Sequence, residues 1–363
     1  MPIREESFRI GCGRYLQGPG ILSKCGEEGL RLGTSPLVIG DETTLGLTRD
    51  ILSESFGKTC KKYEFYTHNG TCNEGDAQAV ASFAREQGFD VILGAGGGVL
   101  MDFAQLSAHF AGLPVINLPP SSATCAAYAP LSVCYTPEGR TVGTRHYQKE
   151  VDAVLADTEL LAKQPVRLLL SGVFDAMAKF VEIKHRYHGD LSGSFPLGLN
   201  YAYALAEHSF ALLEEKTEPC IEAMIRGEIT EDVENVIFTA IAATGVISGI
   251  ARGSNQTALG HKFYETTRLL FPEESKPYLH GEIVGVGLIL QNYYNGDDEN
   301  NLRLLARMEK YGMPRSITDV GVRKSPEAFE EYYTRICNSS AIHRDDEAEC
   351  ARFRESLQAL WEL

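Results

Sequence analysis

The stretch Asp90-Val-Ile-Leu-Gly94-Ala-Gly96-Gly97-Gly98-Val-Leu-Met-Asp102 decides how the first half of the chain folds. It begins as a short apolar run, passes through a glycine cluster and continues as a helical pattern, which predicts a strand, a tight turn and a helix. Glycine lets backbone N–H groups come close to a pyrophosphate at the positive end of a helix. Such turns also occur for purely steric reasons, so this loop alone does not establish nucleotide binding.

Further apolar runs of strand length lie on both sides of this stretch and alternate with helical stretches. They are PLVIG at 36–40, YEFY at 63–66, PVINLP at 114–119 and VDAVLAD at 151–157. Strands that alternate with helices at this spacing predict a parallel, doubly wound sheet. Later segments, such as 197–216 and 229–250, have helical periodicity instead. We therefore expect an α/β domain over residues 1–160 and an all-α domain over residues 161–363.

Composition and charge exclude several kinds of partner. The formal net charge of −15 opposes binding to nucleic acid or to an anionic membrane surface. The run MPIREESFRI lacks the apolar stretch of a signal peptide, and no later run approaches the roughly 20 apolar residues of a membrane span. Nine cysteines without a CxxC pair argue against a disulfide framework. We expect a cytoplasmic protein with a small-molecule substrate, no nucleic-acid partner and no membrane partner.

Asp41 directly follows the predicted strand at 36–40. A carboxylate at the end of such a strand can hydrogen-bond an adenosine ribose and repel a 2′-phosphate. It can equally cap the helix that follows. Both interpretations stay open at this point.

Three segments in the second half each place a candidate metal ligand on or near a helix. They are LSGVFDAMAKF with Asp175, TALGHKFYE with His261 and YLHGEIVGVG with His280. One carboxylate, two imidazoles and an open position suit a catalytic Zn²⁺ or Fe²⁺. The intervals between the three residues match no compact metal motif, so each residue could also be an ordinary buried or surface group.

Taken together, these segments resemble the iron-containing alcohol dehydrogenase superfamily, in its glycerol dehydrogenase-like branch. The similar segments, in chain order, are GAGGGVLMDFA, LPPSSATCAAYAPLSVCYTPEGR, DTELLAKQPVRLLLSGVFDAMAKF and LHGEIVGVG. The resemblance implies a dehydroquinate synthase-like architecture. In that architecture a Rossmann-like NAD-binding domain (1–160) precedes a helical metal-binding domain (161–363).

The resemblance also implies roles for individual residues. Asp175, His261 and His280 match the metal ligands of the family, and Asp41 matches the position that favours NAD over NADP. Further positions match cofactor contacts of the family: Gly96, Gly97, Gly98, Asp102, Thr124, Leu131 and Tyr135.

Four positions depart from the pattern of the family. Cys125 stands where glycerol dehydrogenases carry an aspartate that contacts the polyol, and the run 123–128 instead resembles bacterial hydroxycarboxylate dehydrogenases, which reduce small 2-oxo acids. Val99 and Gln105 replace a small or basic residue and a lysine, which implies weaker phosphate contacts. Tyr264 replaces a second histidine, which leaves a three-ligand site.

Arg252 completes the expected substrate pocket with Cys125 and Tyr264. It lies in a segment that the family places near the substrate, where a guanidinium can hold a carboxylate bidentately. The alternative for Arg252 is a solvated surface arginine.

These features predict a metal-dependent oxidoreductase that transfers hydride between NAD(H) and a small alcohol, polyol or 2-hydroxy/2-oxo acid. Two alternatives stay open. One is a dehydroquinate synthase-like cyclase that uses NAD transiently, and the other is a non-catalytic descendant, suggested by Val99, Gln105 and Cys125. Because relatives form dimers and octamers, we also expect a homo-oligomer.

Overall fold

The structure is a computed structural model that describes residues 8, 10–187, 197–251 and 256–363. The chain divides into two compact units. The sheet unit comprises Arg9–Pro165 and Glu215–Gly245. The helical unit comprises Val166–Glu214 and Val246–Leu363, together with the N-terminal residue Phe8. The first boundary thus lies at Pro165, and Glu215–Gly245 groups with the sheet unit although it lies inside the range expected for the all-α domain.

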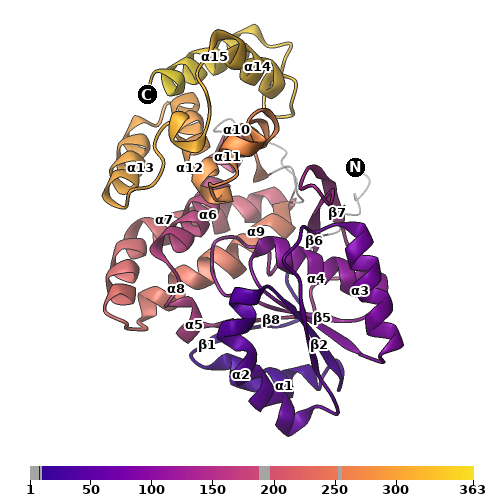
Figure 1. The fold of residues 1–363 in the computed structure, drawn as a ribbon. Coiled ribbons are helices and arrows are strands. Elements are labelled where there is room, and N and C mark those ends of the chain that lie inside the picture. The colour runs from indigo at the N-terminus through magenta and orange to yellow at the C-terminus, as the bar shows by residue number, and fades with distance from the viewer. Residues whose placement is uncertain (1–7, 9, 188–196, 252–255) are drawn as a thin grey trace. The chain divides into compact units, whose positions relative to one another are not determined.

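In the described part of the chain, the sheet unit is built on a six-stranded parallel sheet with the order β1-β8-β5-β4-β2-β3 (Figure 1). A two-stranded antiparallel hairpin of β6 and β7 stands apart from that sheet. The strands are β1 Tyr15–Gly18, β2 Pro36–Gly40, β3 Glu64–Thr67, β4 Val91–Ala95, β5 Val115–Leu118, β6 Leu131–Tyr135, β7 Thr141–His146 and β8 Ala153–Asp157.

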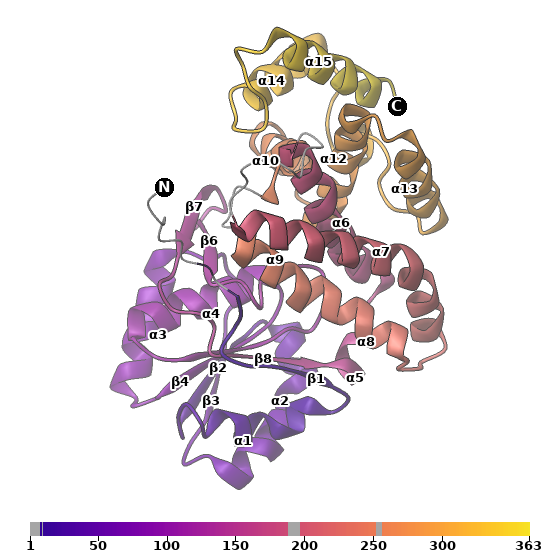
Figure 2. The ribbon, with the colours of Figure 1, turned by 180° about the vertical axis from the view of Figure 1, so that it is seen from behind.

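Helices cover both faces of this sheet. Those of the sheet unit are η1 Ile21–Lys24, α1 Cys25–Gly29, α2 Glu42–Thr59, α3 Glu74–Glu86, α4 Gly98–Ala111, α5 Thr158–Leu161, α8 Glu231–Phe238 and the π-helix η2 Thr239–Ala243. Both ribbon views place α1 and α2 on one face and α3 and α4 on the other (Figures 1 and 2). A buried apolar cluster lies between the sheet and α2. It includes Val38, Leu93, Ile116 and Leu155 from the strands and Phe56 from α2.

The strand order creates a switch point between β2 and β4. These strands are neighbours, but α2 leads from β2 to β3 while α4 leads from β4 to β5, in opposite directions along the sheet. The right-handed connections of parallel strands then place α2 and α4 on opposite faces. Ligands of open α/β sheets bind in the crevice beyond the carboxyl ends of strands at such a point.

The doubly wound sheet predicted from the sequence is confirmed. Each predicted run forms a strand, namely β2, β3, β4, β5 and β8. The edge strand β1 and the β6–β7 hairpin were not predicted. β1 is four residues long, and β7 is mostly exposed, so neither carries the continuous apolar run of a central parallel strand.

The helical unit is all-α in its described residues, and no strand occurs in the described chain after Asp157. Its helices include α6 Val166–Tyr187, α10 Leu259–Leu270, α11 Pro272–Ser275, α12 His280–Asn295, α13 Asp298–Lys310, η4 Thr318–Val320, α14 Pro326–Cys337 and α15 Glu347–Glu362. Two further helices cross the limits of the units: α7 Leu197–Ile225 and α9 Thr244–Ala251.

One helical stretch, Glu231–Ala251, is long and apolar enough to cross a membrane when length and composition alone are considered. It covers α8, η2 and α9. Within its most apolar window 56% is buried inside the protein, as in the core helix of a soluble protein. The sequence analysis gave this stretch, as 229–250, a helical pattern and no membrane role, and a helix of this length and composition is weak evidence for a membrane span.

Candidate metal centre

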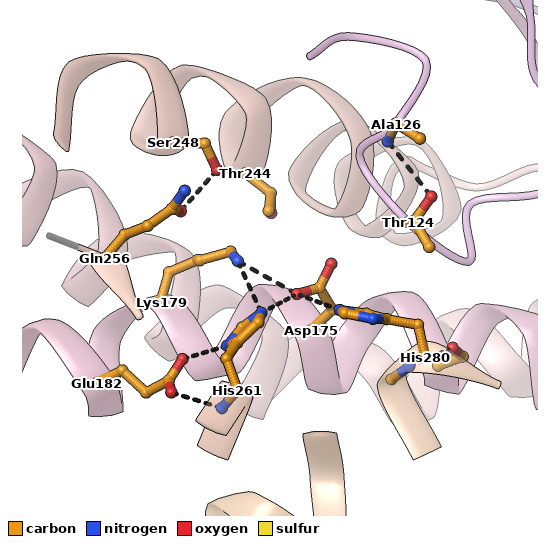
Figure 3. A network of polar contacts seen from close by, with 12 residues as sticks. Thr124, Ala126, Asp175, Lys179, Glu182, Thr244, Ser248, Gln256, His261 and His280 are labelled. Atoms are coloured by element: carbon orange, nitrogen blue, oxygen red, sulfur yellow. Dashed lines mark hydrogen bonds and ion pairs between the residues drawn. The ribbon is translucent and has the colours of Figure 1, made fainter. Parts of the chain in front are cut away.

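Three helices of the helical unit bring the predicted metal ligands together (Figure 3). Asp175 lies on α6, His261 lies in the first turn of α10, and His280 is the first residue of α12. One ligand atom from each of these side chains lies within 4.8 Å of the other two. Residues that are far apart in the sequence thus form one cluster, which we call the triad.

Glycines let these helices approach closely enough to form the triad. A Cβ on Gly281 would overlap the carbonyl oxygen of Ser171 on α6, and the Gly281 N–H donates to the Ser171 hydroxyl at 3.1 Å. A Cβ on Gly287 would lie 2.5 Å from the carbonyl oxygen of Gly260 on α10. Because neither glycine carries a side chain, α12 packs directly on both helices and holds His280 at its N-terminal end.

Asp175 Oδ1 is the centre of the triad. It lies 3.4 Å from His261 Nε2 and 3.7 Å from His280 Nε2. This buried oxygen accepts no well-aligned hydrogen bond from the described residues. Ligand atoms about 2.1 Å from a tetrahedral zinc ion lie about 3.4 Å apart. The donor set and its spacing therefore fit a divalent ion with a coordination position left for a substrate.

Glu182 orients His261 for this role. Its Oε2 lies 2.5 Å from His261 Nδ1, and its Oε1 accepts hydrogen bonds from the backbone N–H groups of Ala258 and His261 at 2.7 and 2.8 Å. When the Nδ1–H of His261 donates a hydrogen bond to this carboxylate, the lone pair of the ring is on Nε2, which faces Asp175. The sequence analysis missed Glu182. Its position in the sequence could have indicated this role, because Glu182 lies seven residues after Asp175 and therefore on the same face of α6.

The charge states of Asp175 and His280 also suit a cation. Burial raises the pKa of Asp175, but the Lys179 ammonium, with His261 and His280, outweighs burial and holds that pKa well below its usual range. Burial lowers the pKa of His261, yet the Glu182 and Asp175 carboxylates outweigh it, so the net shift is upward. Desolvation lowers the pKa of His280, although 28% of its side chain stays exposed. An ionised Asp175 and a neutral His280 are the forms that bind a metal.

Lys179 lies inside this cluster, although the sequence analysis did not single it out. Its Nζ is 3.2 Å from Asp175 Oδ1 and 3.4 Å from His261 Nε2, and its side chain is only 5% exposed (Figure 3). Lys179 follows Asp175 by one turn of α6, which places both on the same helix face. A buried cation therefore already faces the proposed metal position.

Two of the three predicted substrate residues, Tyr264 and Cys125, lie in the described part of the chain. Tyr264 is half-buried, and its ring packs edge-on against His280 with the ring centroids 4.3 Å apart. Tyr264 thus lines the triad with an aromatic wall. Cys125 is half-buried in the sheet unit, where its carbonyl oxygen accepts the Tyr128 N–H at 2.9 Å. Arg252 lies outside the described residues.

The glycine loop lies at the switch point of the sheet unit. Gly96 and Gly97 connect β4 to α4, and β4 pairs with β2 so that Ala95 lies opposite Gly40. No described residue lies within 4 Å of the Cβ that a side chain at Gly97 would carry. Gly97, the N-cap of the 14-residue helix α4, thus has open space where a side chain would stand, which is compatible with an anion-binding loop.

Asp41 caps the helix that follows it, as one of its two interpretations stated. Its carboxylate accepts the Thr44 N–H at 2.8 Å and the Thr44 hydroxyl at 2.9 Å, at the N-terminus of α2. The same carboxylate also borders the glycine loop, because a Cβ on Gly96 would lie 3.0 Å from Asp41 Oδ2. Capping does not remove Asp41 from the switch point, so its predicted choice of NAD remains a prediction.

The segment with Thr124 packs on the N-terminal end of α4. A Cβ on Gly98 would lie 3.4 Å from Thr124 Oγ1 and 3.5 Å from Ala126 Cβ. The Gln105 amide donates to the Ala126 carbonyl oxygen at 3.3 Å. Gln105, which replaces a lysine of the family, thus connects α4 to this segment. Val99 is 44% exposed beside the loop.

Asp102 joins α4 to the hairpin strand that carries Leu131 and Tyr135. It is 5% exposed, and its Oδ2 accepts the Val133 N–H at 3.0 Å. Burial raises the pKa of Asp102 to about 8. Leu131, Val133 and Tyr135 share the half-buried face of β6. The Asp102 side chain therefore links α4 to β6 through a hydrogen bond. Its predicted contact with the cofactor stays a prediction.

Comparisons with known proteins identify the relatives of this chain. Its residues 12–158 match the family profile of iron-containing alcohol dehydrogenase. It is 28% identical to a glycerol dehydrogenase of Thermotoga maritima over 92% of this chain and 90% of that protein. It is 30% identical to hydroxycarboxylate dehydrogenase A of Escherichia coli, over 75% of this chain and 73% of that protein.

The fold agrees with these relatives. Glycerol dehydrogenase of Schizosaccharomyces pombe superposes with a TM-score of 0.84 at 22% identity, covering 99% of this chain and 91% of that one. A probable glycerol dehydrogenase of Sinorhizobium meliloti gives a TM-score of 0.82 at 23% identity, covering 98% of each chain. The predicted fold class, a parallel-sheet part followed by a helical part, is confirmed.

Proposed function

The chain belongs to the iron-containing alcohol dehydrogenase family, and we propose that it transfers hydride between NAD(H) and a small substrate with the help of a divalent metal ion. Membership makes it an oxidoreductase of the alcohol and glycerol dehydrogenase type. The observation that carries the proposed metal dependence is the triad, in which Asp175, His261 and His280 offer three ligand atoms within 4.8 Å of one another.

The residues of the triad would hold the ion and keep it available to a substrate. When bound, a divalent ion supplies a Lewis acid that polarises an alcohol or carbonyl oxygen, and a nicotinamide ring supplies or accepts the hydride. Asp175 contributes a carboxylate that stays ionised because its pKa is low. Glu182 keeps the His261 ring oriented with Nε2 toward Asp175.

The sheet unit supports NAD as the nucleotide. The first turn of α4 offers backbone N–H groups to a pyrophosphate, and Gly97 leaves the approach open among the described residues. Asp41 borders the same loop, where its negative charge would repel a 2′-phosphate. We therefore infer that NADH is preferred to NADPH.

The names of the relatives support a small oxygenated molecule as the substrate. Those with at least 27% identity include glycerol dehydrogenases, hydroxycarboxylate dehydrogenase A and a glycolaldehyde reductase of Halobacterium salinarum. Cys125 in place of the aspartate expected for a glycerol dehydrogenase favours substrates other than glycerol. We propose a small alcohol, polyol, or 2-hydroxy or 2-oxo acid as the substrate.

A cofactor-consumption assay tests this function. Purified chain, stripped with EDTA and reloaded with Zn²⁺ or Fe²⁺, is mixed with NADH and a panel of aldehydes and 2-oxo acids. We expect a net loss of NADH that needs both the metal and one of the carbonyl substrates, and that Asp175→Asn abolishes. No net change of NADH with any substrate, while the metal stays bound, would overturn the proposal in favour of a cyclase or a non-catalytic protein.

A further inference from the structure

Lys179 lies where its positive charge opposes a metal ion. Its Nζ is 3.2 Å from Asp175 Oδ1, the oxygen at the centre of the triad, and 3.4 Å from the ligand atom of His261. A zinc ion would bind that oxygen at about 2.1 Å. A protonated lysine has three N–H donors and no lone pair, so it cannot act as a ligand while it carries its charge. Two cations would therefore share one carboxylate oxygen.

Burial of both side chains strengthens the repulsion between the Lys179 ammonium and a metal ion on Asp175. The side chains of Lys179 and Asp175 are each 5% exposed, so water screens their charges poorly. The Asp175 carboxylate is compensated by the ammonium in this arrangement, and a buried carboxylate needs such a partner. Glu182, which is fully buried, adds a second negative charge on the same face of α6. The ammonium thus stabilises the triad in the metal-free chain.

We propose that Lys179 is an internal counter-cation that competes with the divalent ion for Asp175. It preassembles the triad before metal binds and weakens the affinity of the site for the metal. This inference rests on the proposed function only in assuming that the triad is the metal site. In this role Lys179 weakens metal binding, whereas a ligand would strengthen it.

The proposal predicts two effects of opposite sign for one substitution. In Lys179→Met the buried Asp175 loses its counter-cation, so the metal-free chain melts at a lower temperature. The same loss removes the competitor, so the dissociation constant for Zn²⁺ falls at least tenfold, or about 1.4 kcal/mol in binding free energy. Ordinary structural damage would lower both the stability and the metal affinity.

The experiment measures both quantities on the full chain. Zn²⁺ affinity is obtained by competition with a chromogenic chelator after EDTA treatment, and the unfolding midpoint of the metal-free chain is obtained by circular dichroism. Lys179→Gln, which also removes the charge but keeps a polar end, is the second variant. Lys184→Met is the matched control, because Lys184 lies on the same helix, is 42% exposed and pairs with Asp297 instead.

Tighter Zn²⁺ binding in Lys179→Met or Lys179→Gln, with a lower midpoint and an unchanged Lys184→Met, supports the proposal. Unchanged or weaker Zn²⁺ binding in both Lys179 variants, with native circular dichroism, overturns it and leaves the proposed function intact. The proposed function fails separately if Asp175→Asn binds Zn²⁺ as tightly as the wild type. In that event the triad is not the metal site, and the role of Lys179 falls with it.

Discussion

Single side chains decide whether the triad can hold a metal, and Glu182 shows this most clearly. Its carboxylate accepts hydrogen bonds from two backbone N–H groups and also contacts His261 Nδ1. Such partners of a ligating histidine fix its ring and its tautomer. The triad therefore depends on a residue that would not itself touch the ion.

We predict that Glu182→Gln weakens Zn²⁺ binding by about 10–100-fold, as is typical when such a partner is changed. Glutamine keeps the size of the side chain but loses the charge that holds the Nδ1 proton. Chelator competition measures the effect. Glu265→Gln is the control, because Glu265 is exposed on α10 and pairs with Lys262. Equal affinities in Glu182→Gln and the wild type would show that His261 needs no such partner.

Asp41 caps α2, and its proposed role in cofactor choice can be separated from capping by substitution. Asparagine is as good an N-cap as aspartate but carries no charge. We predict that Asp41→Asn relaxes the preference for NADH over NADPH and keeps the stability of α2. Asp41→Ala should relax the same preference and also lower the free energy of unfolding by about 1 kcal/mol. Cofactor binding titrations and urea unfolding measure these effects, and an undiminished NADH preference in Asp41→Asn would refute the role in cofactor choice.

At the scale of elements, the sequence predicted the strands that have continuous apolar runs. β2, β4, β5 and β8 are buried along their whole length, and that is the pattern of central parallel strands. The edge strand β1 and the exposed strand β7 carry no such signal, so they were missed. The packing of α12 on α6 and α10 was also beyond prediction, since it depends on where Gly281 and Gly287 meet other helices.

This packing gives a prediction at the same scale. Gly281→Ala would place a methyl group against the backbone of Ser171, which cannot move independently of α6. We expect a loss of about 1–3 kcal/mol in the free energy of unfolding, the range for overpacked sites, together with weaker metal binding. Gly285→Ala is the comparison on α12, because its methyl group would meet side-chain atoms instead of backbone, namely Met308 Cε at 2.8 Å and the Phe174 ring at 3.1 Å, and we expect a smaller loss. Equal stability of the two variants in urea unfolding would contradict this account of α12.

At the scale of the whole molecule, the sequence distinguished a sheet-forming part from a helical part, and the structure assigns helices to units differently. Glu215–Gly245 has a helical pattern but groups with the sheet unit. Periodicity identifies a helix without showing which core it packs against. The metal ligands were likewise found through resemblance to a family, because their spacing in the sequence matches no compact motif. A homo-oligomeric state and a cytoplasmic location remain predictions.

We propose that one divalent ion bound by the triad enables this chain to act as a dehydrogenase. The most direct test plots the rate of NADH oxidation against the metal bound per chain, as EDTA-treated protein is reloaded with Zn²⁺ or Fe²⁺ in the presence of an accepted substrate. We predict that the rate rises in proportion to bound metal, that it saturates at about one ion per chain, the single site formed by the triad, and that His261→Ala stays at the baseline. A full rate in the metal-free chain would contradict the account.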